Sequence, residues 1–253
     1  MNTIEKKEGK PLLSIYFTAG YPTLDSTISI AKKLEEAGAD FLEIGFPYSD
    51  PVADGPVIQH SSEIALANGM TLEKLFDQLN DLREHISIPV FLMGYFNPVL
   101  QFGVEKFCEA CKNVGVTGVI IPDLPMDEYE DFYKETFEKN GVANVFIVTP
   151  QTSTERIRKI DSLSKSFIYL LSSNATTGKT LDVGDNTAAY FKRVYDLHLK
   201  NPLIVGFGIS DKTTFQKATR DTAGAIIGTA FVKRLKDQDY INQIPAFISS
   251  IKA

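Results

Sequence analysis

Short apolar runs rich in Ile, Val and Phe recur along the chain, and each is followed by a longer segment in which apolar residues return at steps of three and four. The short runs predict β-strands, and the longer segments predict amphipathic helices. The predicted strands cover residues 14–19, 40–45, 89–95, 118–122, 144–149, 167–172, 203–208 and 225–228. The predicted helices cover residues 25–37, 72–85, 104–114, 127–140, 154–163, 187–199, 212–219, 230–236 and 241–251.

This alternation of strands and helices implies a parallel sheet, because parallel neighbours must be joined by a crossover. Eight such units in 253 residues give about 32 residues each, which fits a (βα)8 TIM barrel. A doubly wound open sheet is the alternative. The strands are short and evenly spaced, and no linker or low-complexity tract divides the chain. We therefore expect an α/β protein with a single (βα)8 TIM-barrel domain over residues 1–253.

Composition excludes several classes of function. The 43% hydrophobic and 23% charged residues are typical of a globular protein. The net charge of -6 is the wrong sign for a protein that binds nucleic acid or membrane surfaces nonspecifically. No apolar run approaches the roughly 18 residues that span a bilayer, and the first ten residues lack the apolar centre of a secretory signal. With two cysteines only, we expect a cytoplasmic protein that binds neither nucleic acid nor membrane.

Glu43 stands out within the predicted strand 40–45, which is otherwise apolar. Its carboxylate must face either the barrel interior or the helix layer, and both are poorly hydrated. Burial should therefore raise the pKa of Glu43 and suit it to exchange protons near neutral pH. A structural carboxylate paired with a nearby cation is an equally open interpretation.

The loop over residues 46–56 carries three prolines and two aspartates, Asp50 and Asp54. The Asp54-Gly55 pair can form a turn that presents a carboxylate. Capping of a turn is the alternative role for both aspartates. If the surroundings of Glu43 and Asp54 differ, the two carboxyl groups can divide the work of acid and base.

Glycines mark the ends of the last two predicted strands. Gly206 and Gly208 close the seventh, and Gly228 with Thr229 follows the eighth, immediately before a helical stretch. This pattern matches the phosphate site of TIM barrels, where backbone N–H groups and a helix N-terminus hold the anion. The segment 177–178, Thr-Gly, could close over the same anion. Plain turns are the alternative interpretation of these glycines.

Tyr169 offers a hydroxyl group within the apolar strand 167–172, where its alternative role is core packing with a hydrogen bond. The three histidines, His60, His85 and His198, are scattered along the chain, so we predict no metal site. No dinucleotide or nucleoside triphosphate motif is present in the sequence.

The longest motif, LEIGFPYSDPVADGP at residues 42–56, strongly resembles that of the tryptophan synthase alpha chain family. Further motifs similar to the family are FTAGYP at 17–22, MGYFNP at 93–98, IPDLP at 121–125, YLLS at 169–172, TG at 177–178, GFGI at 206–209 and GT at 228–229. The likeness spans nearly the whole chain. It implies a (βα)8 lyase that cleaves indole-3-glycerol phosphate to indole and glyceraldehyde 3-phosphate by a retro-aldol reaction, with no cofactor in this chain.

The resemblance also implies roles for individual residues. Glu43 would move protons at the glycerol hydroxyl and at the indole carbon. Asp54 would accept the indole N–H and stabilise the positive charge on the protonated ring. Tyr169 would support these two catalytic groups. The residues implied in substrate binding are Tyr95, Thr177, Gly178, Gly206, Gly208, Gly228 and Thr229.

A partner follows from the same resemblance. A tryptophan synthase beta chain, which carries pyridoxal phosphate, would receive the indole and dock near Pro47, Asp50 and Asn97. The resemblance implies that the two kinds of chain assemble into an alpha2-beta2 tetramer. Two other interpretations stay open. The chain could be a catalytically weak barrel whose main role is to bind and activate the beta partner. It could also be an isomerase or epimerase of a sugar phosphate, although the long acidic loop and the lack of metal ligands in the sequence disfavour this.

Overall fold

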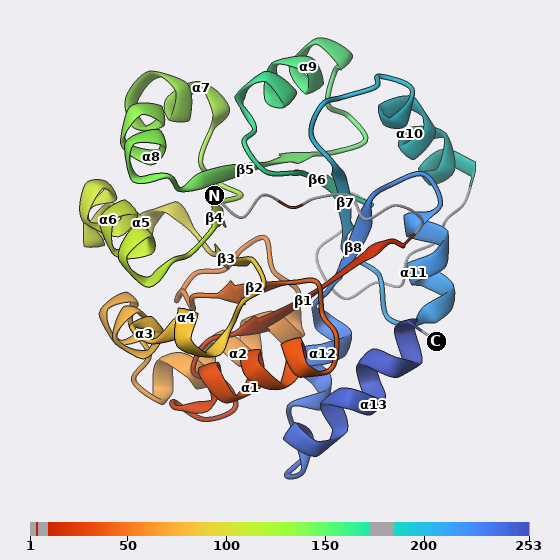
Figure 1. Ribbon diagram of the computed structural model, residues 1–253. Coiled ribbons are helices and arrows are strands. Elements are labelled where there is room, and N and C mark those ends of the chain that lie inside the picture. The colour runs from red at the N-terminus through yellow and green to blue at the C-terminus, as the bar shows by residue number, and fades with distance from the viewer. Residues whose placement is uncertain (1–3, 5–9, 173–184, 253) are drawn as a thin grey trace.

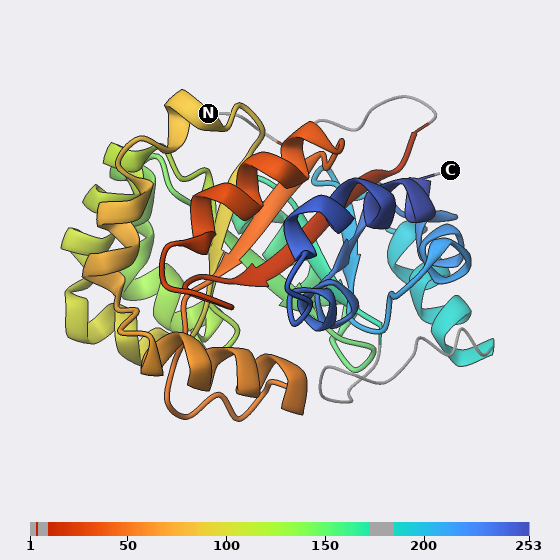
Figure 2. The ribbon, with the colours of Figure 1, turned by 90° about the horizontal axis from the view of Figure 1, so that it is seen from below.

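The computed structural model describes residues 4, 10–172 and 185–252 of the chain. Their parallel strands close into a barrel in the order β1 to β8, with β1 paired to both β2 and β8. The strands are β1 Leu12–Thr18, β2 Phe41–Gly45, β3 Val90–Met93, β4 Gly118–Ile120, β5 Ala143–Val148, β6 Ile168–Leu171, β7 Leu203–Gly206 and β8 Gly224–Ile227. Helices surround these strands on all sides (Figure 1), as a second view confirms (Figure 2). The predicted TIM barrel and its eight strands are confirmed.

The helices follow the prediction less closely. They are α1 Ser26–Glu36, α2 Pro56–Ala67, α3 Leu72–Leu79, α4 Leu82–His85, α5 Phe96–Phe102, α6 Val104–Val114, α7 Met126–Glu128, the π-helical η1 Tyr129–Tyr133, α8 Lys134–Asn140, α9 Thr154–Leu163, α10 Asp185–Tyr195, α11 Lys212–Thr219, α12 Thr229–Arg234 and α13 Tyr240–Lys252. Prediction of one helix over 72–85 was wrong, since α3 and α4 are separate. The sequence pattern also missed α2 and α5. None of the helices in the described ranges is long and apolar enough to cross a membrane.

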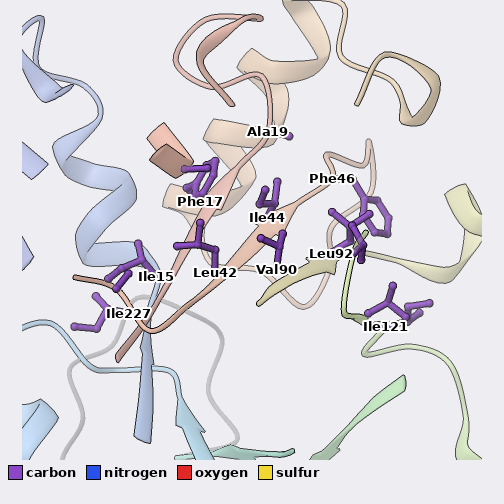
Figure 3. Close-up of a cluster of buried hydrophobic side chains, with 14 of the residues drawn as sticks. Ile15, Phe17, Ala19, Leu42, Ile44, Phe46, Val90, Leu92, Ile121 and Ile227 are labelled. Atoms are coloured by element: carbon purple, nitrogen blue, oxygen red, sulfur yellow. The ribbon is translucent and has the colours of Figure 1, made fainter. Parts of the chain in front are cut away.

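Side chains alternate between the two faces of each strand, as the pleat requires. Outward-facing residues such as Phe17, Leu42 and Ile44 form the layer between the strands and the helices (Figure 3). Inward-facing residues form a second cluster inside the barrel. Both faces of a barrel strand are therefore buried, which explains the continuous apolar runs in the sequence.

Three phenylalanine rings of the inner cluster pack against one another across the barrel. The ring centroids of Phe41, Phe91 and Phe167 lie 5.2 to 6.0 Å apart, mostly in edge-to-face arrangements. We call this group the aromatic floor. Glu43 is two residues beyond Phe41 on β2 and pairs in register with Phe91 on β3. The aromatic floor thus lies in the barrel interior next to Glu43.

Candidate active site

Two cavities adjoin at the carboxyl ends of the strands. The larger, of about 460 Å³, is lined by Glu43, Asp54 and Tyr169 together with the loops after β7 and β8. The smaller, of about 300 Å³, is lined by residues of the loop that follows β2 and of the turn that follows β3. Tyr16 and Asp54 border both cavities. The structure therefore brings the two predicted carboxyl groups to one site at the end of the barrel where TIM-barrel enzymes carry their chemistry.

Glu43 points into the barrel. Its neighbours on β2 fix this direction, because Leu42 and Ile44 belong to the outer layer and Phe41 to the aromatic floor. The side chain is fully buried, and neither carboxylate oxygen has a hydrogen-bond partner among the described residues. Burial raises the pKa of Glu43 to about 8. The ion pair that a purely structural carboxylate would need is not found in the described part of the chain.

Asp54 lies in the loop between β2 and α2 and is held by its surroundings. The Tyr95 hydroxyl donates to Asp54 Oδ2 at 3.2 Å and accepts from the Ala53 N–H at 3.0 Å. The Gln59 side-chain amide donates to the Asp54 carbonyl at 2.9 Å. Burial raises the pKa of Asp54 to about 6, and the hydrogen bond from Tyr95 opposes that rise. The two carboxyl groups thus differ in hydration and in pKa, the condition for separate acid and base roles.

The family resemblance predicts a role in substrate binding for Tyr95. It lies at the turn between β3 and α5, lines the smaller cavity, and packs its ring against Tyr48 with centroids 5.3 Å apart. Its hydroxyl is already engaged with Asp54 and Ala53. In this structure Tyr95 positions Asp54, and its ring remains available to the smaller cavity.

Tyr169 points inward from β6 and is 3% exposed. Burial, followed by the negative charges of Glu43 and Asp54, raises the pKa of its phenol well above the usual range. A Cβ atom at Gly206 would lie 2.0 Å from the Tyr169 hydroxyl oxygen, so only glycine fits at the end of β7. Gly206 does not line either of these two cavities. Its lack of a side chain makes room for Tyr169, a role that the sequence pattern did not separate from anion binding.

The remaining predicted phosphate residues gather at one end of the larger cavity. Gly208, Gly228 and Thr229 all line it. Phe207 and Gly208 adopt positive φ values of 73° and 75°, and this sharp turn carries the chain away from β7. Thr229 begins α12, and no side chain caps that first turn. Thr177 and Gly178 lie outside the described residues.

Several residues of the site were missed by sequence reasoning. Tyr16, Met93, Phe207, Ser210, Lys233 and Arg234 also line the larger cavity. The signal for Tyr16 was available, because it is a phenol within a predicted apolar strand, as Tyr169 is. Lys233 and Arg234 gave no such signal, since cations on a short surface helix usually just face water.

The residues predicted to meet a partner lie at the rim beside the smaller cavity. Pro47 and Asp50 belong to the loop after β2, and Asn97 lies at the start of α5. The Asn97 side chain donates to the Tyr48 hydroxyl at 3.3 Å, which ties the two segments together. Asp50 and Asn97 are exposed and Pro47 is half-buried.

Fold and site together define a TIM-barrel enzyme with two carboxyl groups of different pKa at one end of a cavity and a glycine-rich, helix-N-terminal corner at the other. A sequence model described as tryptophan synthase alpha chain matches residues 2–248. The chain belongs to this family. The family's reaction is the cleavage of indole-3-glycerol phosphate to indole and glyceraldehyde 3-phosphate, so the chain is a carbon–carbon lyase subunit of tryptophan biosynthesis.

Individual relatives agree with the family match. The chain is 55% identical to the tryptophan synthase alpha chain of Christiangramia forsetii over 255 residues, covering 100% of this chain and 99% of the relative. It is 54% identical to that of Flavobacterium psychrophilum over 253 residues, covering 99% and 100%. Among solved structures, tryptophan synthase subunit alpha from Legionella pneumophila superposes with a TM-score of 0.87 at 32% identity, covering 96% of this chain and 92% of that one.

Proposed function

We propose that Glu43 and Asp54 are the acid–base pair with which this chain cleaves indole-3-glycerol phosphate. The observation that carries the proposal is the contrast between them: one fully buried carboxyl group without a hydrogen-bond partner in the described chain, and one half-buried carboxylate held by Tyr95, both on the same cavity. Near neutral pH a pKa of about 8 keeps the proton on Glu43, and a pKa of about 6 leaves Asp54 ionised.

These charge states suit a retro-aldol cleavage. Glu43 donates its proton to the indole carbon that bears the glycerol chain, and Asp54 accepts a hydrogen bond from the indole N–H and balances the resulting positive charge. When the carbon–carbon bond breaks, its electron pair returns to the ring and neutralises that charge. The hydroxyl proton passes to the Glu43 carboxylate as the aldehyde forms. Glu43 ends the cycle protonated, so the reaction balances without a cofactor in this chain.

Tyr169 supports this pair as a neutral phenol on the cavity wall. At the other end of the cavity, the backbone N–H groups near Gly208, Gly228 and Thr229 would bind the phosphate group. Lys233 lines the same cavity one turn into α12, and helical side chains lean towards the N-terminus of their helix. Its positive charge would add to the attraction for a dianion.

Turnover tests this function directly. The purified chain should convert indole-3-glycerol phosphate to indole and glyceraldehyde 3-phosphate in equal amounts, with faster release when a tryptophan synthase beta chain is added. Indole absorbance and a coupled dehydrogenase assay measure the two products. Stimulation of the beta chain without any turnover by this chain would favour the catalytically weak barrel instead. Isomerisation of a sugar phosphate in a substrate panel would favour the third interpretation.

Exposed apolar side chains at the rim support the proposal that a beta chain docks there. Val52 in the loop after β2 is 82% exposed, Leu100 on α5 is 45% exposed, and Phe132 in η1 is 67% exposed. The ring of Tyr133, next to Phe132, packs 5.2 Å from that of Phe96 on α5. We define Val52, Leu100 and Phe132 as the rim surface. A beta chain docked there would cover apolar area that is otherwise in water. The assembly we propose is an alpha2-beta2 tetramer, in which the beta chains carry pyridoxal phosphate.

Replacing Phe132 by Asp should weaken association with the beta chain by about tenfold or more, because it would bury a charge where a large apolar side chain packed. Titration calorimetry between the two chains measures the dissociation constant. Tyr195→Asp is the matched control, since Tyr195 is 47% exposed but lies on α10. Equal dissociation constants for the Phe132 variant and the parent would show that the beta chain docks elsewhere.

A further inference from the structure

Tyr16 lines the site but has no role in the acid–base reaction proposed above. It lies on β1 and pairs in register with Glu43 on β2. Leu13, Ile15 and Phe17 of the same strand belong to the outer layer, so Tyr16 points into the barrel. It is partly exposed, and it lines both cavities.

The Tyr16 side chain connects the two ends of the larger cavity. A Cβ atom at Gly228 would lie 3.4 Å from the Cβ and Cδ1 atoms of Tyr16, so the ring begins against the glycine of the phosphate end. A Cβ atom at Gly45 would lie 2.2 Å from the Tyr16 hydroxyl oxygen. Gly45 is two residues beyond Glu43 and on the same face of β2. The phenol therefore reaches from the phosphate end of the cavity to the strand that carries Glu43.

The hydroxyl group of Tyr16 remains a neutral phenol there. Burial is the main cause, and the neighbouring carboxyl group of Asp54 adds to it, so that the pKa of Tyr16 lies far above its usual range. The Thr18 side chain opposes this rise but does not cancel it. A neutral phenol can both donate and accept a hydrogen bond, which suits it to a hydroxyl group of a ligand.

The substrate class of the proposed function supplies such a hydroxyl. Indole-3-glycerol phosphate joins its ring to its phosphate through a three-carbon chain with two hydroxyl groups. The one beside the ring gives up its proton in the reaction, and the other is carried unchanged into the aldehyde product. With the phosphate at Gly228 and the reacting carbon at Glu43, the chain between them must run along Tyr16.

We propose that the Tyr16 hydroxyl forms a hydrogen bond with the non-reacting hydroxyl of the substrate's three-carbon chain, a contact that rests on the proposed function of Glu43 and Asp54. The contact makes Tyr16 a specificity-determining residue. It selects a hydroxylated linker over a plain alkyl linker, because a buried hydroxyl without a partner is costly. The other phenol of the larger cavity, Tyr169, has its hydroxyl over Gly206 at the end of β7. Strand β7 neighbours β8, which precedes Gly228, but it does not neighbour β2, the strand of Glu43 and Gly45.

Tyr16→Phe tests the contact with two ligands that differ in their hydroxyl groups. The variant should lower kcat/KM for indole-3-glycerol phosphate by about tenfold, the effect of losing one good hydrogen bond. Its dissociation constant for indole-3-propanol phosphate, which has the same ring, chain length and phosphate but no hydroxyl on the chain, should stay within about twofold of the parent value. Binding of this second ligand, followed by titration calorimetry, also shows that the variant site is folded.

Equal losses for the two ligands would overturn the proposal, because Tyr16 would then only shape the cavity. An unchanged kcat/KM would overturn it as well. Tyr190→Phe is the matched control: its buried phenol donates to the Val148 carbonyl at 2.9 Å, and it does not line either cavity, so it should leave both ligand constants unchanged. Glu43→Gln distinguishes failure of the proposed function from failure of the Tyr16 contact. Parent-like turnover by Glu43→Gln would reject the acid–base pair itself. An inactive Glu43→Gln variant together with a parent-like Tyr16→Phe variant would reject only the Tyr16 contact.

Discussion

Glu43→Gln is expected to lower kcat for indole release by about a thousandfold, within the range that proton transfer by a positioned side chain contributes. The amide fills almost the same volume but cannot donate a proton to the indole carbon and then accept one from the hydroxyl. Steady-state indole release at saturating indole-3-glycerol phosphate measures the loss. Parent-like kcat in a folded variant would contradict the assignment. Glu63→Gln, at an exposed position of α2, is the control and should keep the parent rate.

The same variant should unfold at a temperature no lower than the parent, and the reason lies in the sign of the pKa shift. Between about pH 4.5, the ordinary value of the group, and about pH 8, the folded chain keeps the Glu43 proton and the unfolded chain has lost it. Folding stability linked to this group is therefore fully present at low pH and is lost as the pH rises through 8. Because glutamine does not titrate, the difference in melting temperature between variant and parent should grow in favour of the variant from pH 5 to pH 8.

Asp54→Asn is expected to lower kcat/KM by about a hundredfold, since a neutral amide cannot balance the positive charge on the protonated ring. The parent should show a bell-shaped dependence of kcat/KM on pH. Activity falls below about pH 6, where Asp54 takes up a proton, and above about pH 8, where Glu43 loses one. The Asn variant should keep the alkaline limb and lose the acid limb, as pH profiles of both proteins would reveal.

Tyr95→Phe is expected to shift the pKa of Asp54 without removing its carboxyl group. It removes the hydrogen bond that favours the Asp54 carboxylate, so the pKa of Asp54 should rise and the acid limb should move to higher pH. The alkaline limb belongs to Glu43 and should stay in place. A shift of both limbs together, or of neither, would mean that Tyr95 acts on the ring of the substrate and not through Asp54.

Much of the fold could be predicted from the sequence because each barrel strand is buried on both faces. Such strands give short, unbroken apolar runs, and the pattern located all of the strands that the structure describes. Helices gave weaker signals. Helix α2 begins at Pro56, directly after a proline-rich loop, so the sequence pattern does not show where the loop ends and the helix begins. Helix α5 has only seven residues and contains Pro98. Neither offers the repeated apolar stripe on which the helix prediction depended.

The site was predicted in its residue types and only partly in its geometry. A strand that is apolar on both faces carries no mark of which face is inward, so the direction of Glu43 needed the register with its neighbours. Gly206 and Gly208 looked alike in sequence. The structure separates them, because Gly206 makes room for Tyr169 and Gly208 lines the cavity. The spacing of a motif gives positions along one strand. It does not show that a side chain of the neighbouring strand, here Tyr169, occupies the space beside a glycine.

The aromatic floor also gives the barrel interior a chemical task. Phe41, Phe91 and Phe167 do not line either cavity, yet their rings fill the barrel interior next to Glu43. They keep the surroundings of the Glu43 carboxyl group apolar, which favours its protonated form and raises its pKa. These three side chains therefore bear on reactivity as well as on packing, and a smaller residue at one of them is expected to change the working pH of the enzyme.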